Sequence, residues 1–331
     1  MILTITLNPS MDYNYLVSSL ILDQVNRVEN PHTSIGGKGI NAGRVIAQSG
    51  EGVVLTGILG GPVGKMILDT LNAENRYHLE FLSVEGNSRN AITIMHDGNT
   101  HTELVEKGLY LSKENEALFF QHVAHLLKKY KIDTICISGS VNSDDAKFHL
   151  HLLDFIRSIV GKSFPILMDI SGEQLENVLV QQSVRPTFIK PNTHELEELV
   201  GRKIQTPEEI VALLHEPLFD NIETIMISQG GDGAIVKHES TVYDVRIPKV
   251  DIVNTTGCGD STVGGMAFAI SNGYSIEDAI RYAMACGISN SLFETNGTIS
   301  TEQVNQFFKE INLVEIEELL LKNSYIKTKY T

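Results

Sequence analysis

The feature that most constrains the fold is an alternation of short apolar runs with helical patterns along the chain. The runs expected to be strands are 2–7, 53–58, 132–138, 165–170, 187–190 and 224–228. Between most of them apolar residues recur at helical spacing, as in Phe119, Val123, Leu126, Leu127 and Tyr130. Such an alternation predicts an α/β fold, with a mostly parallel central sheet and helices on both faces.

Two segments carry explicit helix-start signals. Thr206, Pro207 and Glu209 combine an N-cap, a proline at the first helical position and a capping-box glutamate. Ser275 precedes Ala279 in a second candidate start. We therefore expect helices to begin after Thr206 and after Ser275.

Two regions, 12–35 and 88–106, interrupt the alternation. The second has a two-residue periodicity over 91–95, followed by a turn at Asp97-Gly98-Asn99. This pattern is typical of short strands joined by a tight turn. We expect the two regions to form a small β-sheet outside the main layer.

Length, charge and cysteine content limit the classes of function. The chain has 331 residues and no obvious linker, so we expect one domain over 1–331, ending in a helix and a polar tail over 301–331. The net charge of −15 disfavours nucleic acid and anionic membranes as partners. No apolar run approaches the ~18 residues of a membrane span, and no signal peptide is evident. The sparse cysteines, Cys136, Cys258 and Cys286, indicate a reducing compartment, so we expect a cytoplasmic protein.

The clearest chemical signal is the turn around residue 257. Extended residues over 245–253 lead into Gly257-Cys258-Gly259-Asp260, and a helix rich in Gly and Ala follows. Backbone amides at a helix start suit an anion, and these small side chains leave the amides accessible. A carboxylate beside that anion is unfavourable unless it accepts a proton from a hydroxyl that attacks phosphorus. The alternative is an ordinary turn in which Asp260 complements the helix dipole.

Three further motifs precede this turn. They are Gly36-Gly37-Lys38-Gly39-Ile40-Asn41, Lys190-Pro191-Asn192-Thr193-His194-Glu195 and Ser228-Gln229-Gly230-Gly231-Asp232-Gly233. Residues 59–66 lack the first Gly and the Ser or Thr of a P-loop, and 257–262 lack the third Gly of a dinucleotide fingerprint. The second absence argues against a nicotinamide-dependent oxidoreductase.

Over about residues 1–300, the four ordered motifs resemble those of the ribokinase-like (PfkB) carbohydrate kinases, with Asn254 and Cys258 replacing the family's Asp and Ala. The resemblance implies that Asp260 is the general base and that the amides of Gly257, Cys258 and Gly259 form an anion hole. It implies substrate binding by Asp12, Arg27, Gly37, Lys38, Asn41, Arg89, Ser138 and Ser140. It implies nucleotide binding by Lys190, Asn192, Ser228, Gly230, Gly233, Gly287 and Asn290. Asn192 and Glu195 would hold Mg²⁺, mainly through water.

The function implied is ATP-dependent phosphorylation of a ketohexose phosphate. The opening residues and Lys38 resemble the branch of the family that acts on tagatose 6-phosphate or fructose 1-phosphate. Asn254 is part of the reason to expect tagatose 6-phosphate, converted to tagatose 1,6-bisphosphate, with fructose 1-phosphate as the alternative substrate. In an acidic chain, Arg27, Lys38 and Arg89 would converge to supply the positive charge that a sugar phosphate needs. A non-catalytic nucleotide- or sugar-phosphate-binding regulator stays open as an alternative, although Asp260 argues against it.

The resemblance also implies a β-lid built from 12–35 and 88–106. Because a small sheet is marginal alone in water, we expect a homodimer through the lid, which would bring Arg27 near the pocket. At a helix start the pKa of the Cys258 thiol would be lowered. The alternative is that Cys258 merely replaces another small residue.

Overall fold

The structure is a computed structural model that describes residues 1–98, 100–181 and 183–316. Within these residues, ten strands form a main sheet with the order β14-β13-β12-β11-β10-β9-β8-β1-β4-β5. The strands are β1 (Ile2–Thr6), β4 (Val53–Leu59), β5 (His78–Ser83), β8 (Thr134–Ser138), β9 (Ile166–Asp169), β10 (Phe188–Ile189), β11 (Thr224–Ser228), β12 (Ala234–His238), β13 (Thr241–Arg246) and β14 (Asn312–Glu315). From β5 to β11 all neighbours are parallel, and β12, β13 and β14 continue the sheet antiparallel.

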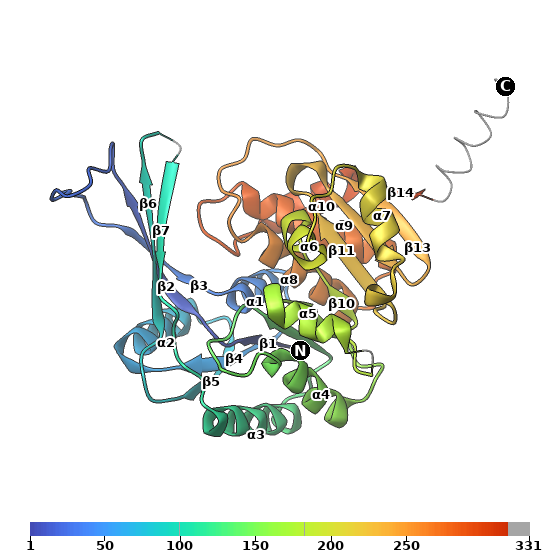
Figure 1. The fold of residues 1–331 in the computed structure, drawn as a ribbon, viewed down its shortest axis with the longest axis horizontal. Helices are drawn as coiled ribbons and strands as arrows, with labels where there is room; N and C mark the ends of the chain where they lie inside the picture. Colours follow the sequence, from blue (N-terminus) through green and yellow to red (C-terminus); the bar gives the residue numbers. More distant parts are fainter. Residues whose placement is uncertain (99, 182, 317–331) are drawn as a thin grey trace.

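Helices cover both faces of this sheet (Figure 1). One apolar core layer lies under α1 (Lys38–Gln48), α2 (Gly61–Glu74), α8 (Cys258–Ser271), α9 (Ile276–Ser291) and α10 (Thr301–Glu310). The other lies under α3 (Lys113–Lys129), α4 (Phe148–Val160), α5 (Gly172–Val180), α6 (Thr193–Val200) and α7 (Pro207–Leu214). Short 3₁₀ turns lie at Pro217–Phe219 and Gly230–Asp232. The predicted α/β fold class is confirmed, because a parallel sheet is buried between two helix layers.

Each of the six expected strands is present within two residues of its predicted bounds. The expected helix starts are also present, with the Thr206 and Ser275 side chains accepting the amides of Glu209 and Asp278. The extended segment predicted over 245–253 is only partly correct, since β13 ends at Arg246 and irregular backbone leads to α8. The terminal helix is α10, and the edge strand β14 follows it; the expected polar tail lies outside the described residues from 317 onward.

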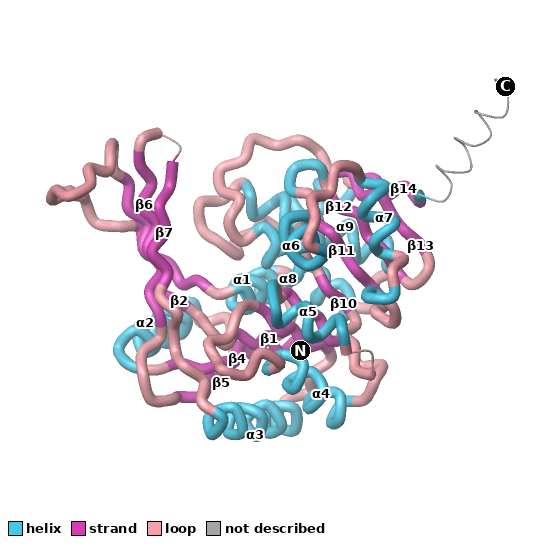
Figure 2. Tube along the Cα trace, viewed as in Figure 1, coloured by secondary structure: helices cyan, strands magenta, loops and turns pink. Residues whose placement is uncertain are grey.

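A second, four-stranded sheet stands beside the main body (Figure 2). It has the order β3-β2-β6-β7 and consists of β2 (Ser10–Leu16), β3 (His32–Gly36), β6 (Arg89–His96) and β7 (Thr100–Val105). The expected turn after β6 places Asp97 and Gly98 at positive φ, while Asn99 lies outside the described residues. The four strands lie in or beside the two regions expected to form this sheet. That the sheet serves as a lid stays a prediction, as does the expectation that residues 1–331 form one domain.

Candidate active site

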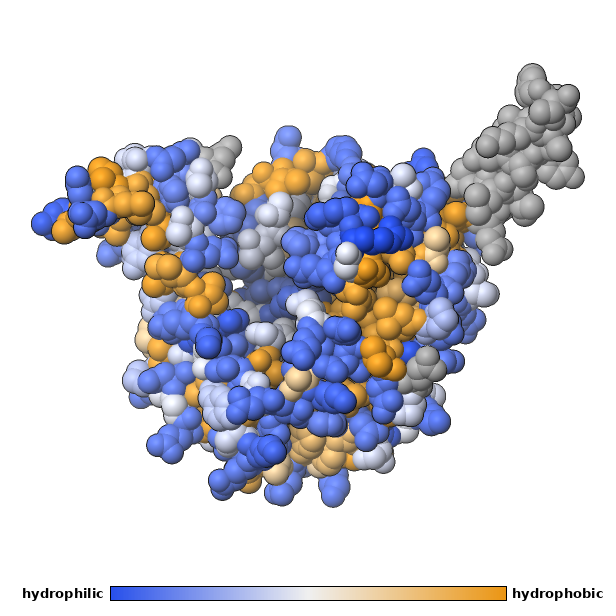
Figure 3. Space-filling model, viewed as in Figure 1, coloured by the Kyte–Doolittle hydropathy of each residue, from blue (hydrophilic) through white to orange (hydrophobic). Residues whose placement is uncertain are grey.

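Four neighbouring strands bring polar residues to one edge of the main sheet. Ser138 ends β8, Asp169 ends β9, Lys190 follows β10 and Ser228 ends β11. Parallel strands place their carboxyl ends together, and open α/β sheets bind ligands there. Figure 3 shows a hollow between the small sheet and the main body, and Figure 1 places α1 and α8 at its base.

No helix in the described part of the chain is long and apolar enough to cross a membrane.

Asp169 lies between the charged groups of Lys38 and Lys190 at this edge. Its carboxylate, only 2% exposed, lies 3.2 Å from Lys38 Nζ and 4.0 Å from Lys190 Nζ. Lys38 also lies 3.8 Å from Glu195. Burial alone would lower the pKa of Lys38, but the carboxylates of Asp169, Glu195 and Asp260 raise it, so the ammonium stays charged. Asp169 was not among the site residues expected from the sequence, although it is a charged residue at the carboxyl end of an otherwise apolar run.

The start of α8 presents backbone amides to the same edge. Gly257, its N-cap, has φ 80° and ψ −3°, a left-handed conformation that favours glycine. Within the described residues the amides of Gly257 and Gly259 have no backbone acceptor, and the Cys258 amide makes only a long 3.4 Å bond to Thr255 O. A Cβ at Gly259 would lie 3.0 Å from Lys190 Nζ, so this lysine faces the same amides. Amides and an ammonium together suit a phosphoryl group.

Asp260 lies in the first turn of α8, near both a carboxylate, Asp169, and the two ammonium groups of Lys38 and Lys190. Asn41 Nδ2 donates a 2.8 Å hydrogen bond to its Oδ2. Burial, with help from Asp169, raises the pKa of Asp260 to about 6, although Asn41, Lys38 and Lys190 act in the opposite direction. A carboxylate with such a pKa is ionised at neutral pH yet is a stronger base than an exposed aspartate, as a general base requires.

The pKa of the Cys258 thiol is shifted in the direction opposite to the one expected. Burial raises the pKa of its thiol, with Asp260 adding to the rise, so the expectation of a lowered thiol pKa is wrong. The Sγ atom lies 3.7 Å from Asn254 O and 3.5 Å from Asn290 Nδ2. Hence only the backbone of Cys258 has the geometry for an anion hole.

Two residues expected at the nucleotide are interior instead. Asn290, with 0% exposure, donates to Thr256 O and accepts from Ser261 Oγ and the Gly297 amide. Gly287 is buried against Thr262, which a Cβ would approach to 2.4 Å. This burial contradicts direct contact with a nucleotide. Both residues brace the start of α8 against α9.

The glycine-rich turn after β11 divides into an open and a closed part. Ser228 is half-buried, and Gly230 is exposed, where an added Cβ would meet no other atom within 4 Å. Gly233 is buried, and a Cβ there would lie 1.9 Å from Val245 O. We therefore keep Ser228 and Gly230 as candidate nucleotide contacts, whereas Gly233 allows β12 to pack on β13.

The small sheet supplies the polar groups of the opposite wall. Ser10 Oγ donates a 2.5 Å hydrogen bond to the Asp12 carboxylate. This carboxylate lies against Gly36, where an added Cβ would come within 2.3 Å of it. Burial raises the pKa of Asp12, opposed by Ser10 and by the charge of Arg89. Arg89 is half-buried, and its Nε has no hydrogen-bond partner in the described chain. These groups suit a hydroxylated, anionic ligand.

The three expected cations do not converge within one chain. Arg27 is exposed on the loop between β2 and β3, whereas Lys38 is paired with Asp169 and Glu195. Asn41, expected at the substrate, is 3% exposed and bonds Asp260 instead. Gly37, the N-cap of α1, and the exposed Ser140 lie beside the site, while Ser138 is 3% exposed.

The expected magnesium residues fit an indirect role only. Asn192 and Glu195 form a reciprocal capping box at the start of α6, with both bonds at 2.8 Å. That leaves Glu195 Oε1 facing Lys38. The described residues contain no group of three His, Cys, Asp or Glu side chains that suits a metal. This donor set fits Mg²⁺ held mainly by water and phosphate.

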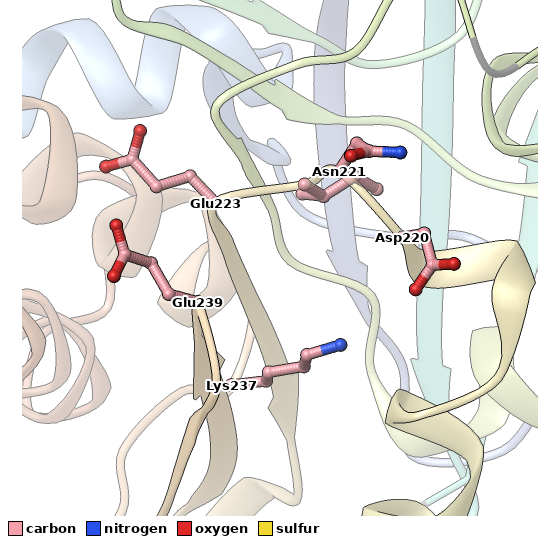
Figure 4. Close-up of a pocket in the computed structure, with 6 residues that line it drawn as sticks. Asp220, Asn221, Glu223, Lys237 and Glu239 are labelled. Atoms are coloured by element: carbon pink, nitrogen blue, oxygen red, sulfur yellow. The ribbon is translucent and has the colours of Figure 1, made fainter.

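A hollow of about 380 Å³ lies elsewhere, at the amino end of β11 (Figure 4). It is lined by Asp220, Asn221, Ile222, Glu223, Lys237 and Glu239. Lys237 Nζ donates to Leu214 O within the protein. Because ligands bind at the opposite, carboxyl edge of such sheets, this hollow is not the active site.

Known proteins are similar to this chain in sequence and in fold. The family model described as pfkB family carbohydrate kinase matches residues 5–299. A tagatose-6-phosphate kinase from Staphylococcus epidermidis is 37% identical over 323 residues, covering 96% of this chain and 100% of the relative. A Staphylococcus aureus protein provisionally assigned as a phosphofructokinase has 28% identity and a TM-score of 0.77, covering 95% of this chain and 99% of its own. A Thermotoga maritima protein provisionally assigned as a 1-phosphofructokinase has 23% identity, a TM-score of 0.82 and coverages of 95% and 99%; this likeness concerns the fold alone.

Proposed function

The chain belongs to the pfkB family of carbohydrate kinases and is an ATP-dependent sugar-phosphate kinase, and from this premise we propose that it phosphorylates tagatose 6-phosphate to tagatose 1,6-bisphosphate. The single observation that carries the proposal is Asp260 beside the open amides of Gly257 and Gly259. The choice of tagatose 6-phosphate is supported by the 37% identity to a tagatose-6-phosphate kinase over nearly the whole chain.

In the proposed reaction the Asp260 carboxylate accepts the proton of the sugar C1 hydroxyl. The hydroxyl oxygen attacks the γ-phosphorus of ATP, the bond from that phosphorus to the bridging oxygen breaks, and ADP leaves. The amides of Gly257 and Gly259 and the Lys190 ammonium stabilise the negative charge of the transferring group. Mg²⁺, when bound, neutralises charge on the nucleotide phosphates, and Asn192 and Glu195 would contact its water shell.

On the sugar side, we propose that Asp12 accepts sugar hydroxyls and that Arg89 binds the existing phosphate. Arg89 is suited to this because its half-buried guanidinium keeps an unpartnered Nε. Lys38 lies among Asp169, Glu195 and Asp260, so we place it at the transferring phosphoryl group rather than at the sugar phosphate.

A coupled assay of ADP formation tests the substrate. It compares tagatose 6-phosphate, fructose 1-phosphate, fructose 6-phosphate and unphosphorylated sugars at equal concentration. Fructose 1-phosphate is the second candidate, because the opening residues and Lys38 fit either substrate. Highest kcat/KM with any sugar other than tagatose 6-phosphate would overturn the first choice.

The Asp260→Asn variant tests the chemistry. Loss of a general base costs about 10²–10⁴-fold in rate, while ATP binding, measured by calorimetry, should stay near that of the parent. A variant that keeps more than about half of the activity would exclude Asp260 as the base. A parent protein that binds both ligands but turns over none would instead indicate a binding regulator.

A further inference from the structure

A chain of buried and part-buried hydrogen bonds runs from Asp260 through Asn41 and Arg44 to Glu74. Asn41, which donates to Asp260, accepts a 3.2 Å hydrogen bond at Oδ1 from Arg44 Nη1. Arg44 is only 8% exposed and also donates to Ile35 O at 3.1 Å. Its other nitrogens bind Glu74, with Nη2 2.7 Å from Oε1. Tyr77 donates a 2.5 Å hydrogen bond to Glu74 Oε2.

The donor pattern of this chain determines how the Asn41 amide is oriented. An asparagine side chain has a donor end and an acceptor end of nearly the same shape, so packing alone does not select one orientation. The guanidinium of Arg44 can only donate, and therefore it selects the oxygen of Asn41. The NH₂ group must then face Asp260, whose ionised carboxylate can only accept.

We propose that Arg44 is a positioning residue for phosphoryl transfer: it holds the Asn41 amide in the one orientation that donates to Asp260. The proposal builds on the proposed function, in which Asp260 is the general base. Glu74 and Tyr77, at the end of α2 and just beyond it, hold the guanidinium in place. An ion pair between α1 and α2 thereby reaches the catalytic carboxylate without touching substrate.

The consequence concerns the ionisation of Asp260. A hydrogen bond to the charged form favours that form, and the Asn41 bond lowers the pKa of Asp260 against the effects of burial and Asp169. The other ionisable groups that face Asp260 are Lys38, Lys190 and Cys258. Removing Arg44 leaves them in place but frees the Asn41 amide to turn, so the Asp260 pKa rises.

A double-mutant cycle tests this. The variants are Arg44→Met, Asn41→Ala and both together, with Arg76→Met as the matched control, because Arg76 is an exposed arginine whose charge also reaches Glu74. The readout is kcat/KM for the sugar phosphate from about pH 5 to about pH 9. We expect Arg44→Met to move the acid limb upward by about one pH unit, with activity recovering at high pH and KM for ATP unchanged. Arg76→Met should leave the profile in place.

The Asn41→Ala background separates positioning from the charge of Arg44. If Arg44 acts through Asn41, adding Arg44→Met to Asn41→Ala should shift the limb little further. Equal shifts in both backgrounds, or no shift in either, would overturn the proposal. Arg44 would then serve only to form an ion pair between α1 and α2.

A measurement on the parent protein covers the case in which Arg44→Met fails to fold. The Asn41 side-chain NH₂ resonance, assigned by its absence in Asn41→Ala, should titrate with Asp260 and lose that titration in Asp260→Asn. A resonance that does not respond to Asp260 would refute the proposal. Activity retained in Asp260→Asn would refute the proposed function instead, so the two failures are distinguishable.

Discussion

At the scale of single residues, the site depends on two carboxylates with different tasks. Asp169 is buried at the end of β9, where it holds Lys38 and faces Lys190. Asp260 lies at the start of α8, and its pKa is raised to about 6. The charge of Asp169 contributes to that rise, so the residue that pairs with Lys38 also raises the pKa of the proposed base.

The raised pKa of Asp260 predicts the pH dependence. Only the ionised carboxylate accepts a proton, so kcat/KM should fall as the pH decreases through about 6 and reach a plateau above it. A pH profile measured with saturating ATP checks this, using a thermal melt at each pH to exclude unfolding. An acid limb near 4, the ordinary range of an aspartate, would contradict the environment described for Asp260.

Arg89→Ala should act on the sugar phosphate alone. Loss of a charge-assisted contact to a phosphate predicts a rise of roughly 10-fold or more in its KM, with KM for ATP nearly unchanged. Arg246→Ala is a suitable control, because this arginine is exposed on β13. A selective rise in the KM for ATP would place Arg89 at the wrong end of the site.

At the scale of elements, the start of α8 combines structural and chemical roles. Its loop is held from behind by Asn254, which donates to Glu294 O at 3.0 Å and accepts from the Thr256 amide at 2.9 Å. Asn290 holds the same loop from α9. With the loop fixed from behind, the amides in front stay preorganised for charge, which is the main source of electrostatic catalysis.

Cysteine labelling reports on this helix start. Cys258 is half-buried, whereas Cys136 and Cys286 are 0% exposed, and burial raises the pKa of all three thiols. We expect slow alkylation at Cys258 and slower still at the other two. ATP should protect Cys258, and a bulky adduct there should abolish turnover. Mass-mapped labelling with parallel assays checks this; full labelling of Cys258 with intact activity would refute the anion-hole geometry.

At the scale of the whole molecule, the small sheet is not covered by the main body. Leu16 is 82% exposed, Leu22 82% and Val25 83%, on β2 and on the loop that follows it. Figure 3 shows hydrophobic surface at this end of the molecule. Exposed apolar side chains gathered in one place are typical of an interface, and we propose that a second copy covers them through its own small sheet.

The dimer proposal predicts a concentration-dependent mass. The parent should sediment as a dimer, and Val25→Asp should dissociate it, because a charge would be buried at the interface. Val180→Asp is the control, since Val180 is 65% exposed on α5, away from the small sheet. If Arg27 of one copy completes the site of the other, dissociation should also raise KM for the sugar phosphate. A fully active monomer at micromolar concentration would contradict both statements.

The sequence by itself determined the layered α/β architecture and the order of the chemical motifs. The buried strands are near-continuous apolar runs, a signal that depends on local composition alone. The short glycine-rich turns and Asp260 were equally visible, because each motif occupies a few consecutive residues. Less visible were the two edge strands, β5 and β14, and the antiparallel strands β12 and β13, where pairing partners decide strand formation more than propensity does.

Only the tertiary structure decided which side chains meet. Asp169 and Arg44 have no motif of their own; they became recognisable because β9 ends beside Lys38 and Arg44 of α1 forms an ion pair with Glu74 at the end of α2. Asn41 and Asn290 looked like ligand contacts, yet buried polar groups must be satisfied, and both are satisfied by protein. Burial and neighbouring charge also set the pKa values of Asp260 and Cys258. These effects join residues far apart in the chain, so no local pattern could contain them.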